Sequence, residues 1–109
     1  MSRFAEVLSR LSATIEARKG ADASSSYTAK LLAGGPALAG KKMGEEAIEA
    51  IIAAVQNDPD ALAAESADLI YHWLVLLAAA GVSLDAVADK LAAREGRSGI
   101  EEKASRPKA

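Results

Sequence analysis

The chain has 109 residues, which suits a single domain, and its net charge of −2 gives no general attraction to nucleic acid or to an anionic membrane. It contains no cysteine, which excludes disulfides and thiolate zinc sites. Hydrophobic residues make up 50% of the sequence and aromatic residues only 4%, with alanine supplying much of the apolar material. We therefore expect a thin core of the kind that oligomerisation often completes.

The first third of the chain predicts two helices. Polar and charged residues interrupt the N-terminal segment every few positions, which is not the pattern of a secretory signal. Its apolar residues recur at helical spacing and predict a helix from about Ser2 to Lys19, ended by Gly20. A serine cluster and a Gly-Gly pair then bracket a short capped helix, from about Ser26 to Ala33.

The middle of the chain predicts two longer helices separated by the sequence NDPD. Pro36 is well placed to begin the first of them, which runs to about Asn57. Asp58 is a good N-cap and Pro59 a good first residue for the next helix, which runs to Ala80. The connections are short, so neighbouring helices are expected to be antiparallel.

Ser83 is expected to cap a fifth helix, and the rest of the chain, from residue 96, is polar and charged. We therefore predict an all-α fold of about five helices, with a helical domain over residues 1–95 and a polar tail over residues 96–109. The longest apolar run, residues 69–82, is shorter than the roughly 20 residues that a membrane-spanning helix needs. These patterns indicate a cytoplasmic protein that spans no membrane.

Three glutamates, Glu45, Glu46 and Glu49, lie on the third predicted helix beside a compact apolar stripe. Glu45 is only about 20° from Ile52 around the helix axis. We expect the stripe to be the packed face of this helix, so that the three acids border buried surface. The stripe consists of Ile48, Ile51, Ile52 and Val55.

The fourth predicted helix carries Glu65, Asp68 and His72 on one face, in a segment that is apolar almost all round and therefore expected to be buried. If the two acidic faces meet, four or five carboxylates converge, and their mutual repulsion raises pKa values. A divalent cation would compensate these charges, and oxygen-only ligands favour Mg²⁺ or Mn²⁺. Lys41 and Lys42, one turn before the glutamates, would suit phosphate oxygens carried by that ion.

Each of these features also has a purely structural interpretation. The pattern EE-x-x-E near a helix start is common on solvated faces, where it favours the helix dipole and pairs with lysine. Lys41 and Lys42 could equally be solvated charges. A single His72 on an apolar helix is more often a hydrogen-bonded core residue than a metal ligand, and Tyr71 and Trp73 are expected in the core or in an interface.

The stretches GEEAIEAIIAA and ESADLIYHWLVLL resemble the phosphoribosyl-ATP pyrophosphohydrolases of histidine biosynthesis, which belong to the MazG-type all-α nucleotide pyrophosphohydrolases. The superfamily signature, EE-x-x-E followed by E-x-x-D, falls on Glu45, Glu46, Glu49, Glu65 and Asp68. The narrower family is indicated by SYTAKL, KKMGEEA, DLIYHWLVLL and the RSGIEEKASR tail.

This resemblance implies that water cleaves the α–β phosphoanhydride of 1-(5-phosphoribosyl)-ATP, giving phosphoribosyl-AMP and diphosphate in the second step of histidine biosynthesis. It implies a homodimer whose two subunits complete the helical bundle. Mg²⁺, with Mn²⁺ as the alternative ion, would be held by Glu46, Glu49, Glu65 and Asp68. Glu45 would be a further ligand or a base for the attacking water. The candidate substrate contacts are Lys30, Lys41, Lys42, Ser26 and Thr28, and Tyr27 could help to position the substrate, although Ser26 could serve only as a helix cap.

Two other functions compete with this one. A MazG-type house-cleaning pyrophosphohydrolase would use the same acids and the same metal, and would differ only in its contacts to the base and the ribose. A non-catalytic helical dimerisation module would instead have exposed acids that can be replaced one by one without loss of activity.

Overall fold

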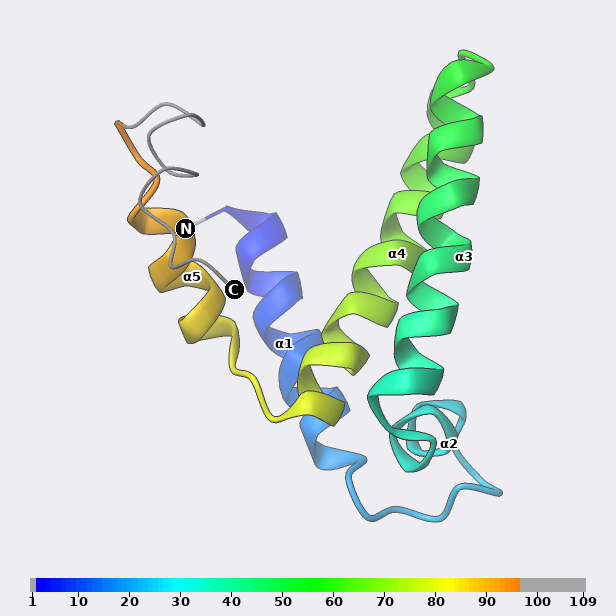
Figure 1. The fold of residues 1–109 in the computed structure, drawn as a ribbon, viewed down its shortest axis with the longest axis vertical. Coiled ribbons are helices and arrows are strands. Elements are labelled where there is room, and N and C mark those ends of the chain that lie inside the picture. Colours follow the sequence, from blue (N-terminus) through cyan, green and yellow to red (C-terminus); the bar gives the residue numbers. More distant parts are fainter. Residues whose placement is uncertain (1, 97–109) are drawn as a thin grey trace.

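Five helices account for most of residues 2–96, the part of the chain that the computed structural model describes (Figure 1). The predicted all-α fold of five helices is therefore confirmed for these residues. The predicted polar tail lies, from residue 97 onward, outside the described residues. The helices are α1 (Arg3–Ala17), α2 (Tyr27–Ala33), α3 (Gly35–Val55), α4 (Pro59–Ala80) and α5 (Leu84–Ala92).

The helix starts follow the capping residues that the sequence predicts. The side chains of Ser26, Asp58 and Ser83 each accept a hydrogen bond from the backbone N–H three residues further on. Asn57 precedes the Asp58 cap with a φ of 57°, a left-handed conformation that asparagine tolerates well. The NDPD segment is therefore a tight turn that reverses the chain between α3 and α4.

Helices α3 and α4 are the longest two and form an antiparallel hairpin that dominates Figure 1. We call residues 35–44 and 69–80 the hairpin base, and residues 45–55 and 59–68 the hairpin arm. Three buried alanines of α3 line its inner side, Ala39 in the base and Ala50 and Ala53 in the arm. Small side chains at a helix contact allow the two backbones to approach closely.

Within the described residues of one chain, the isoleucine stripe of α3 is not covered by another helix. Its four residues are between 49% and 75% exposed, whereas the alanines on the other side of the helix are buried. The hydrophobic pattern located the apolar stripe but could not show which element covers it. Within the described residues of one chain, the stripe Ile48, Ile51, Ile52 and Val55 faces outward.

The hydrophobic core lies at the hairpin base, where α1 and α2 pack against α4. Helix α4 is buried there at four residues and half-buried at most of the others, whereas no residue of its half within the arm is buried, so the prediction of a buried helix holds only in part. Helix α5 contributes no buried residue. The core therefore fixes one end of the hairpin and leaves the arm projecting from it (Figure 1). The buried core residues are Ile15, Leu31, Ala39, Leu74, Val75 and Ala78.

Helix α4 is also the one described helix that is long and apolar enough to cross a membrane by length and composition. It has 22 residues, and its most apolar window has a mean hydropathy of 1.3. The short apolar run of residues 69–82 had suggested that no helix is long enough to span a membrane. The full length of α4 removes that argument. Two carboxylates in the middle of α4, Glu65 and Asp68, and its contact with α3 along the hairpin are features of a helix in a water-soluble bundle.

Candidate active site

Carboxylates from both helices converge in the hairpin arm. Glu46 and Glu49 lie one turn apart on α3, and Glu65 faces them from α4. One carboxylate oxygen from each residue lies within 4.8 Å of the others. The antiparallel pairing of α3 and α4 therefore brings together two motifs that are separated in the sequence, as the acidic faces predicted.

Two oxygens of this cluster are buried without a hydrogen-bond partner in the described structure, Oε2 of Glu46 and Oε2 of Glu65. The neighbouring Glu49 carboxyl and burial, reinforced by Glu46, raise the pKa of Glu65 to about 7. Burial, together with the charges of Glu49 and Asp68, raises the pKa of Glu46. Unpartnered buried oxygens with raised pKa values are a donor set that fits a hard divalent cation.

The other two acidic candidates lie at the edge of this cluster. Asp68 is exposed, one turn beyond Glu65 on α4, and lies outside the group of three within 4.8 Å. Its charge nevertheless contributes to the raised pKa of Glu46. Glu45 is exposed and pairs with Lys42, with 3.8 Å between its Oε2 and the lysine Nζ.

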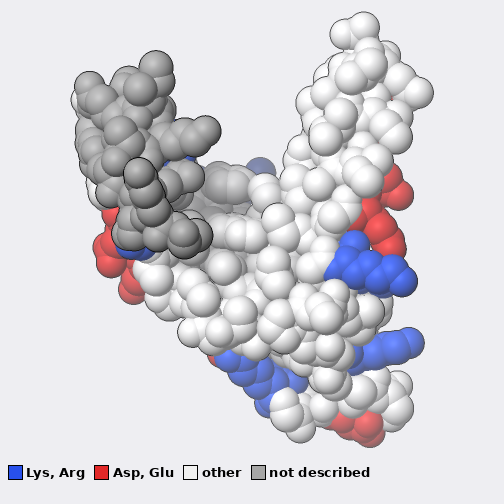
Figure 2. Space-filling model, in the orientation of Figure 1, with Lys and Arg blue, Asp and Glu red and all other residues white. Residues whose placement is uncertain are grey.

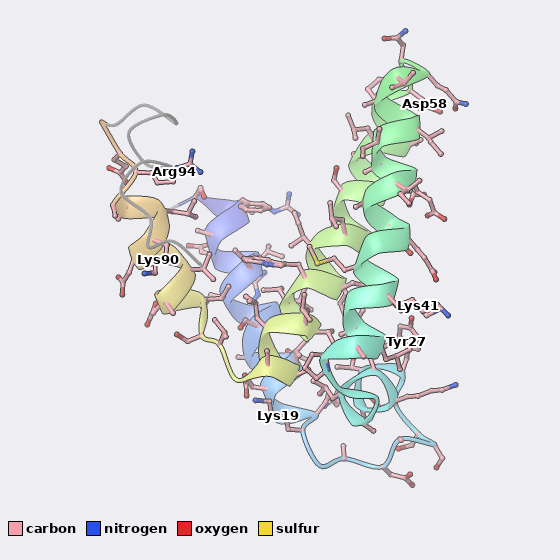
Figure 3. All side chains as sticks on the ribbon, in the orientation of Figure 1. Lys19, Tyr27, Lys41, Asp58, Lys90 and Arg94 are labelled. Carbon is pink, nitrogen blue, oxygen red and sulfur yellow. The ribbon has the colours of Figure 1, made fainter. Side chains whose placement is uncertain are left out.

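Lysine side chains lie beside the carboxylates on the outer side of the hairpin. Figure 2 shows blue and red side chains next to each other there, and the ion pair between Lys42 and Glu45 joins the two signs of charge. Lys41 is exposed on the same helix, and Figure 3 shows its side chain extending outward on the side where Tyr27 lies. Lys30 is exposed in the last turn of α2.

The polar residues of α2 have structural partners. Ser26 Oγ accepts a hydrogen bond of 3.2 Å from the N–H of Ala29, so Ser26 does cap its helix. Thr28 Oγ1 shares a short hydrogen bond with the Tyr71 hydroxyl of α4. The contact of Thr28 joins the first turn of α2 to α4, the helix that carries Glu65.

His72 is a buried, hydrogen-bonded residue, as its surroundings in the sequence predicted. It is 6% exposed, its Nδ1 lies 2.8 Å from the carbonyl oxygen of Asp68, and its Nε2 lies 3.4 Å from the Tyr27 hydroxyl. The sequence indicated Tyr27 only as a residue that could help to position the substrate and did not indicate this link from Tyr27 to Asp68. The only signal was that an aromatic residue follows the Ser26 cap, and spacing could not show that it meets α4.

An all-α hairpin that presents converging carboxylates beside lysines has the groups to hold a divalent cation and to contact phosphate oxygens. The family model described as phosphoribosyl-ATP pyrophosphohydrolase matches residues 8–95 of the chain. The chain therefore belongs to the phosphoribosyl-ATP pyrophosphohydrolase family and is a hydrolase. Both the resemblance and the prediction of an enzyme are confirmed.

Relatives from several bacteria support this assignment across nearly the whole chain. A phosphoribosyl-ATP pyrophosphatase of Caulobacter sp. (strain K31) is 73% identical over 107 residues, which cover 98% of this chain and 99% of the relative. The protein of the same name from Ruegeria pomeroyi is 62% identical over 102 residues, 94% of this chain and 97% of the relative. The corresponding Rhodobacter capsulatus protein is 62% identical over 99 residues, 91% of this chain and 96% of the relative.

Proposed function

We propose that this chain hydrolyses the α–β phosphoanhydride of 1-(5-phosphoribosyl)-ATP, giving phosphoribosyl-AMP and diphosphate as the second step of histidine biosynthesis. The observation that carries the proposal is the carboxylate cluster of the hairpin arm, whose buried oxygens on Glu46 and Glu65 have no partner within the described structure. The names of the relatives support the choice of substrate.

Glu46, Glu49 and Glu65, with Asp68 at the edge of the cluster, would hold Mg²⁺, or Mn²⁺ in its place. Three close carboxylates, two of which have a buried oxygen without a hydrogen-bond partner in the described structure, form a donor set that suits a hard cation. When bound, the ion would supply positive charge that compensates the triphosphate and orients its oxygens. Glu45, held by Lys42 beside the cluster, is proposed as a further ligand or as the base that accepts a proton from the attacking water.

We propose that the phosphates are contacted by Lys30, Lys41 and Lys42. An ammonium group on a flexible side chain can donate hydrogen bonds to phosphate oxygens from several directions. Lys42 would exchange its exposed pair with Glu45 for the substrate, at little cost because exposed ion pairs are weak. Ser26 and Thr28 are proposed to position the substrate from the start of α2, which Ser26 caps and Thr28 ties to Tyr71 of α4.

We further propose that the chain works as a homodimer. The outward stripe of α3 offers four large apolar side chains that are at least 49% exposed, directly beside the acidic residues. A second copy that covers this stripe would bury it, as obligate dimers bury surfaces that resemble a core cut in half. We place this dimer in the cytoplasm, without a membrane or nucleic-acid partner, since a small nucleotide substrate requires neither.

The test is diphosphate release from phosphoribosyl-ATP with and without Mg²⁺, compared with release from ATP and dCTP. The proposal predicts release that needs the metal and strongly prefers phosphoribosyl-ATP. Release mainly from ordinary or noncanonical nucleotides would instead support a house-cleaning pyrophosphohydrolase with the same carboxylates. Absence of release from all of them would contradict hydrolysis by this site.

A further inference from the structure

Tyr27 combines two properties that rarely occur together in one tyrosine. The residue is 54% exposed, yet its hydroxyl lies 3.4 Å from Nε2 of His72, which is only 6% exposed. The two rings are nearly perpendicular, with an interplanar angle of 81° and centroids 6.2 Å apart. The polar end of Tyr27 is therefore anchored in the protein interior while much of its aromatic surface stays open to solvent.

The second nitrogen of His72 determines the direction of this hydrogen bond. Nδ1 lies 2.8 Å from the carbonyl oxygen of Asp68, and a carbonyl oxygen can only accept, so Nδ1 carries the proton. In the neutral ring Nε2 is then an acceptor, and the Tyr27 hydroxyl donates to it. One imidazole thus connects the exposed Tyr27 ring to the turn of α4 that carries Asp68 and lies one turn after Glu65.

A second link stiffens this arrangement. Thr28, the neighbour of Tyr27, shares a hydrogen bond with Tyr71 of α4, and the Tyr71 ring stands edge-on to His72 with centroids 5.0 Å apart. The first turn of α2 is therefore tied to α4 at two adjacent residues. Figure 3 shows Tyr27 on the same side of the molecule as Lys41, and Figure 2 shows acidic and basic side chains next to each other on this side.

We propose, resting on the function proposed above, that Tyr27 is the stacking surface for the purine of phosphoribosyl-ATP and that His72 is the positioning residue that fixes its orientation. An exposed aromatic ring with a fixed plane binds a flat base at little cost in side-chain entropy. A ribosyl group on N1 turns adenine into a more basic amidine, which carries positive charge near neutral pH. A tyrosine face attracts such a cation more strongly than it attracts the neutral base of ATP.

The test replaces the ring and separates ligands that contain the base from those that lack it. In Tyr27→Leu, we expect the KM for phosphoribosyl-ATP and the inhibition constant of phosphoribosyl-AMP to rise about tenfold or more, because a base stacked on an aromatic side chain contributes on that scale. The inhibition constant of diphosphate, which has no base, should stay within about twofold of the parent value. Phe4→Leu is the matched control, because Phe4 is an aromatic residue of similar exposure (62%) on α1.

Two further variants test the positioning role. Tyr27→Phe keeps the ring and removes the hydroxyl. It should weaken the binding of phosphoribosyl-AMP by only about two- to tenfold, which is the effect of losing one hydrogen bond. His72→Asn keeps a donor that can reach the Asp68 carbonyl but removes the acceptor for Tyr27. If His72 acts through the Tyr27 hydroxyl, the double variant Tyr27→Phe/His72→Asn should bind phosphoribosyl-AMP no more weakly than the more affected of the two single variants.

Two results would overturn the inference while leaving the proposed hydrolysis intact. One is a Tyr27→Leu enzyme that turns over with an unchanged KM and an unchanged inhibition constant for phosphoribosyl-AMP. The other is an equal weakening of the binding of phosphoribosyl-AMP and of diphosphate, which would mean that the substitution disturbs the phosphate site. Failure of the parent enzyme to release diphosphate from phosphoribosyl-ATP would count against the proposed function itself.

Discussion

The base and the arm of the α3–α4 hairpin are built from the same two helices but have different roles. In the base, Leu74 and Val75 of α4 are almost fully buried against α1 and α2. In the arm, the inner contact is made by alanines, the carboxylates converge beside it, and the isoleucines face outward. Large apolar side chains therefore stabilise the base, whereas in the arm they are left uncovered next to the site.

This difference shows how a short chain can separate stability from function. The base holds the hairpin together through ordinary burial, at about 25 cal/mol per Å² of apolar area removed from water. The arm can then tolerate carboxylates with unpartnered oxygens, whose repulsion and desolvation oppose folding until a ligand compensates them. Substitutions in the arm and in the base should accordingly affect different measurements.

The largest expected effect is on turnover, from Glu49→Gln in the arm. The change removes one carboxylate charge from the cluster and keeps the side-chain shape, so the turnover rate should fall about a hundredfold or more while helix content by circular dichroism is retained. Glu16→Gln is the matched control, since Glu16 is an exposed glutamate paired with Lys19 at 3.0 Å on α1. Full turnover by the Glu49→Gln enzyme would contradict a catalytic role for the carboxylate cluster of the arm.

The next effect is on stability, from Leu74→Ala in the base. Leu74 is 3% exposed, and truncating such a leucine leaves a cavity that costs about 2–5 kcal/mol. The free energy of unfolding in urea should fall by this amount, and Mg²⁺ should still stabilise the folded fraction. Leu91→Ala on α5, where the side chain is 60% exposed, should cost less than about 1 kcal/mol. A similar loss in both variants would mean that the core does not lie at the base.

The third effect is on assembly, from Ile51→Lys in the outward stripe. Ile51 is 62% exposed in the single chain, so a lysine there is tolerated by the monomer but would place a charge in the proposed interface. Sedimentation velocity should show a dimer for the parent protein and a monomer for the variant at micromolar concentration. Leu91→Lys, at a similarly exposed position outside the hairpin, should stay dimeric. A dimer that survives Ile51→Lys would place the interface elsewhere.

The smallest effect is the pH dependence of stability without metal. The pKa of Glu65 is about 7 in the folded protein, above the ordinary value of 4.5, so the folded state binds the proton more tightly. This contribution is fully present below pH 4.5 and is lost as the pH rises to about 7. The melting temperature of the metal-free protein should therefore fall by a few degrees over this range.

Glu65→Gln should remove most of this slope and should raise stability near neutral pH. Asp22 provides an internal contrast, because hydrogen bonds from Ser24 lower its pKa and its contribution is lost only below pH 4. An unchanged slope in Glu65→Gln would show that another group titrates.

Much of the fold followed from local chemistry in the sequence. Ser26, Asp58 and Ser83 cap helices as predicted, and Gly81 ends α4 with a φ of 73°. Helical spacing also placed Glu46, Glu49 and Glu65 on faces that could meet. These features depend on residues within a few positions of one another, or on one pairing of two antiparallel helices, and such features can be read from a sequence.

The rest depended on packing between segments that are distant in the sequence. A hydrophobic stripe does not reveal its partner, so the sequence could not show that the described residues of the same chain leave the stripe of α3 uncovered. The helix contact uses alanines such as Ala50 and Ala53, whose small size rather than hydrophobicity selects them for close approach. The bond between Tyr27 and His72 joins residues 45 positions apart, and no local pattern indicates it.

The most direct test of the central claim, that the arm carboxylates form a cation site, is a calorimetric titration of Mn²⁺ into the metal-free parent protein and into Glu65→Gln at pH 6.5, where Glu65 of the metal-free protein is mostly protonated. The account predicts saturable binding by the parent protein, accompanied by proton release from Glu65, and binding at least about tenfold weaker, without that proton release, by the variant. Equal Mn²⁺ affinity in the two proteins would contradict it.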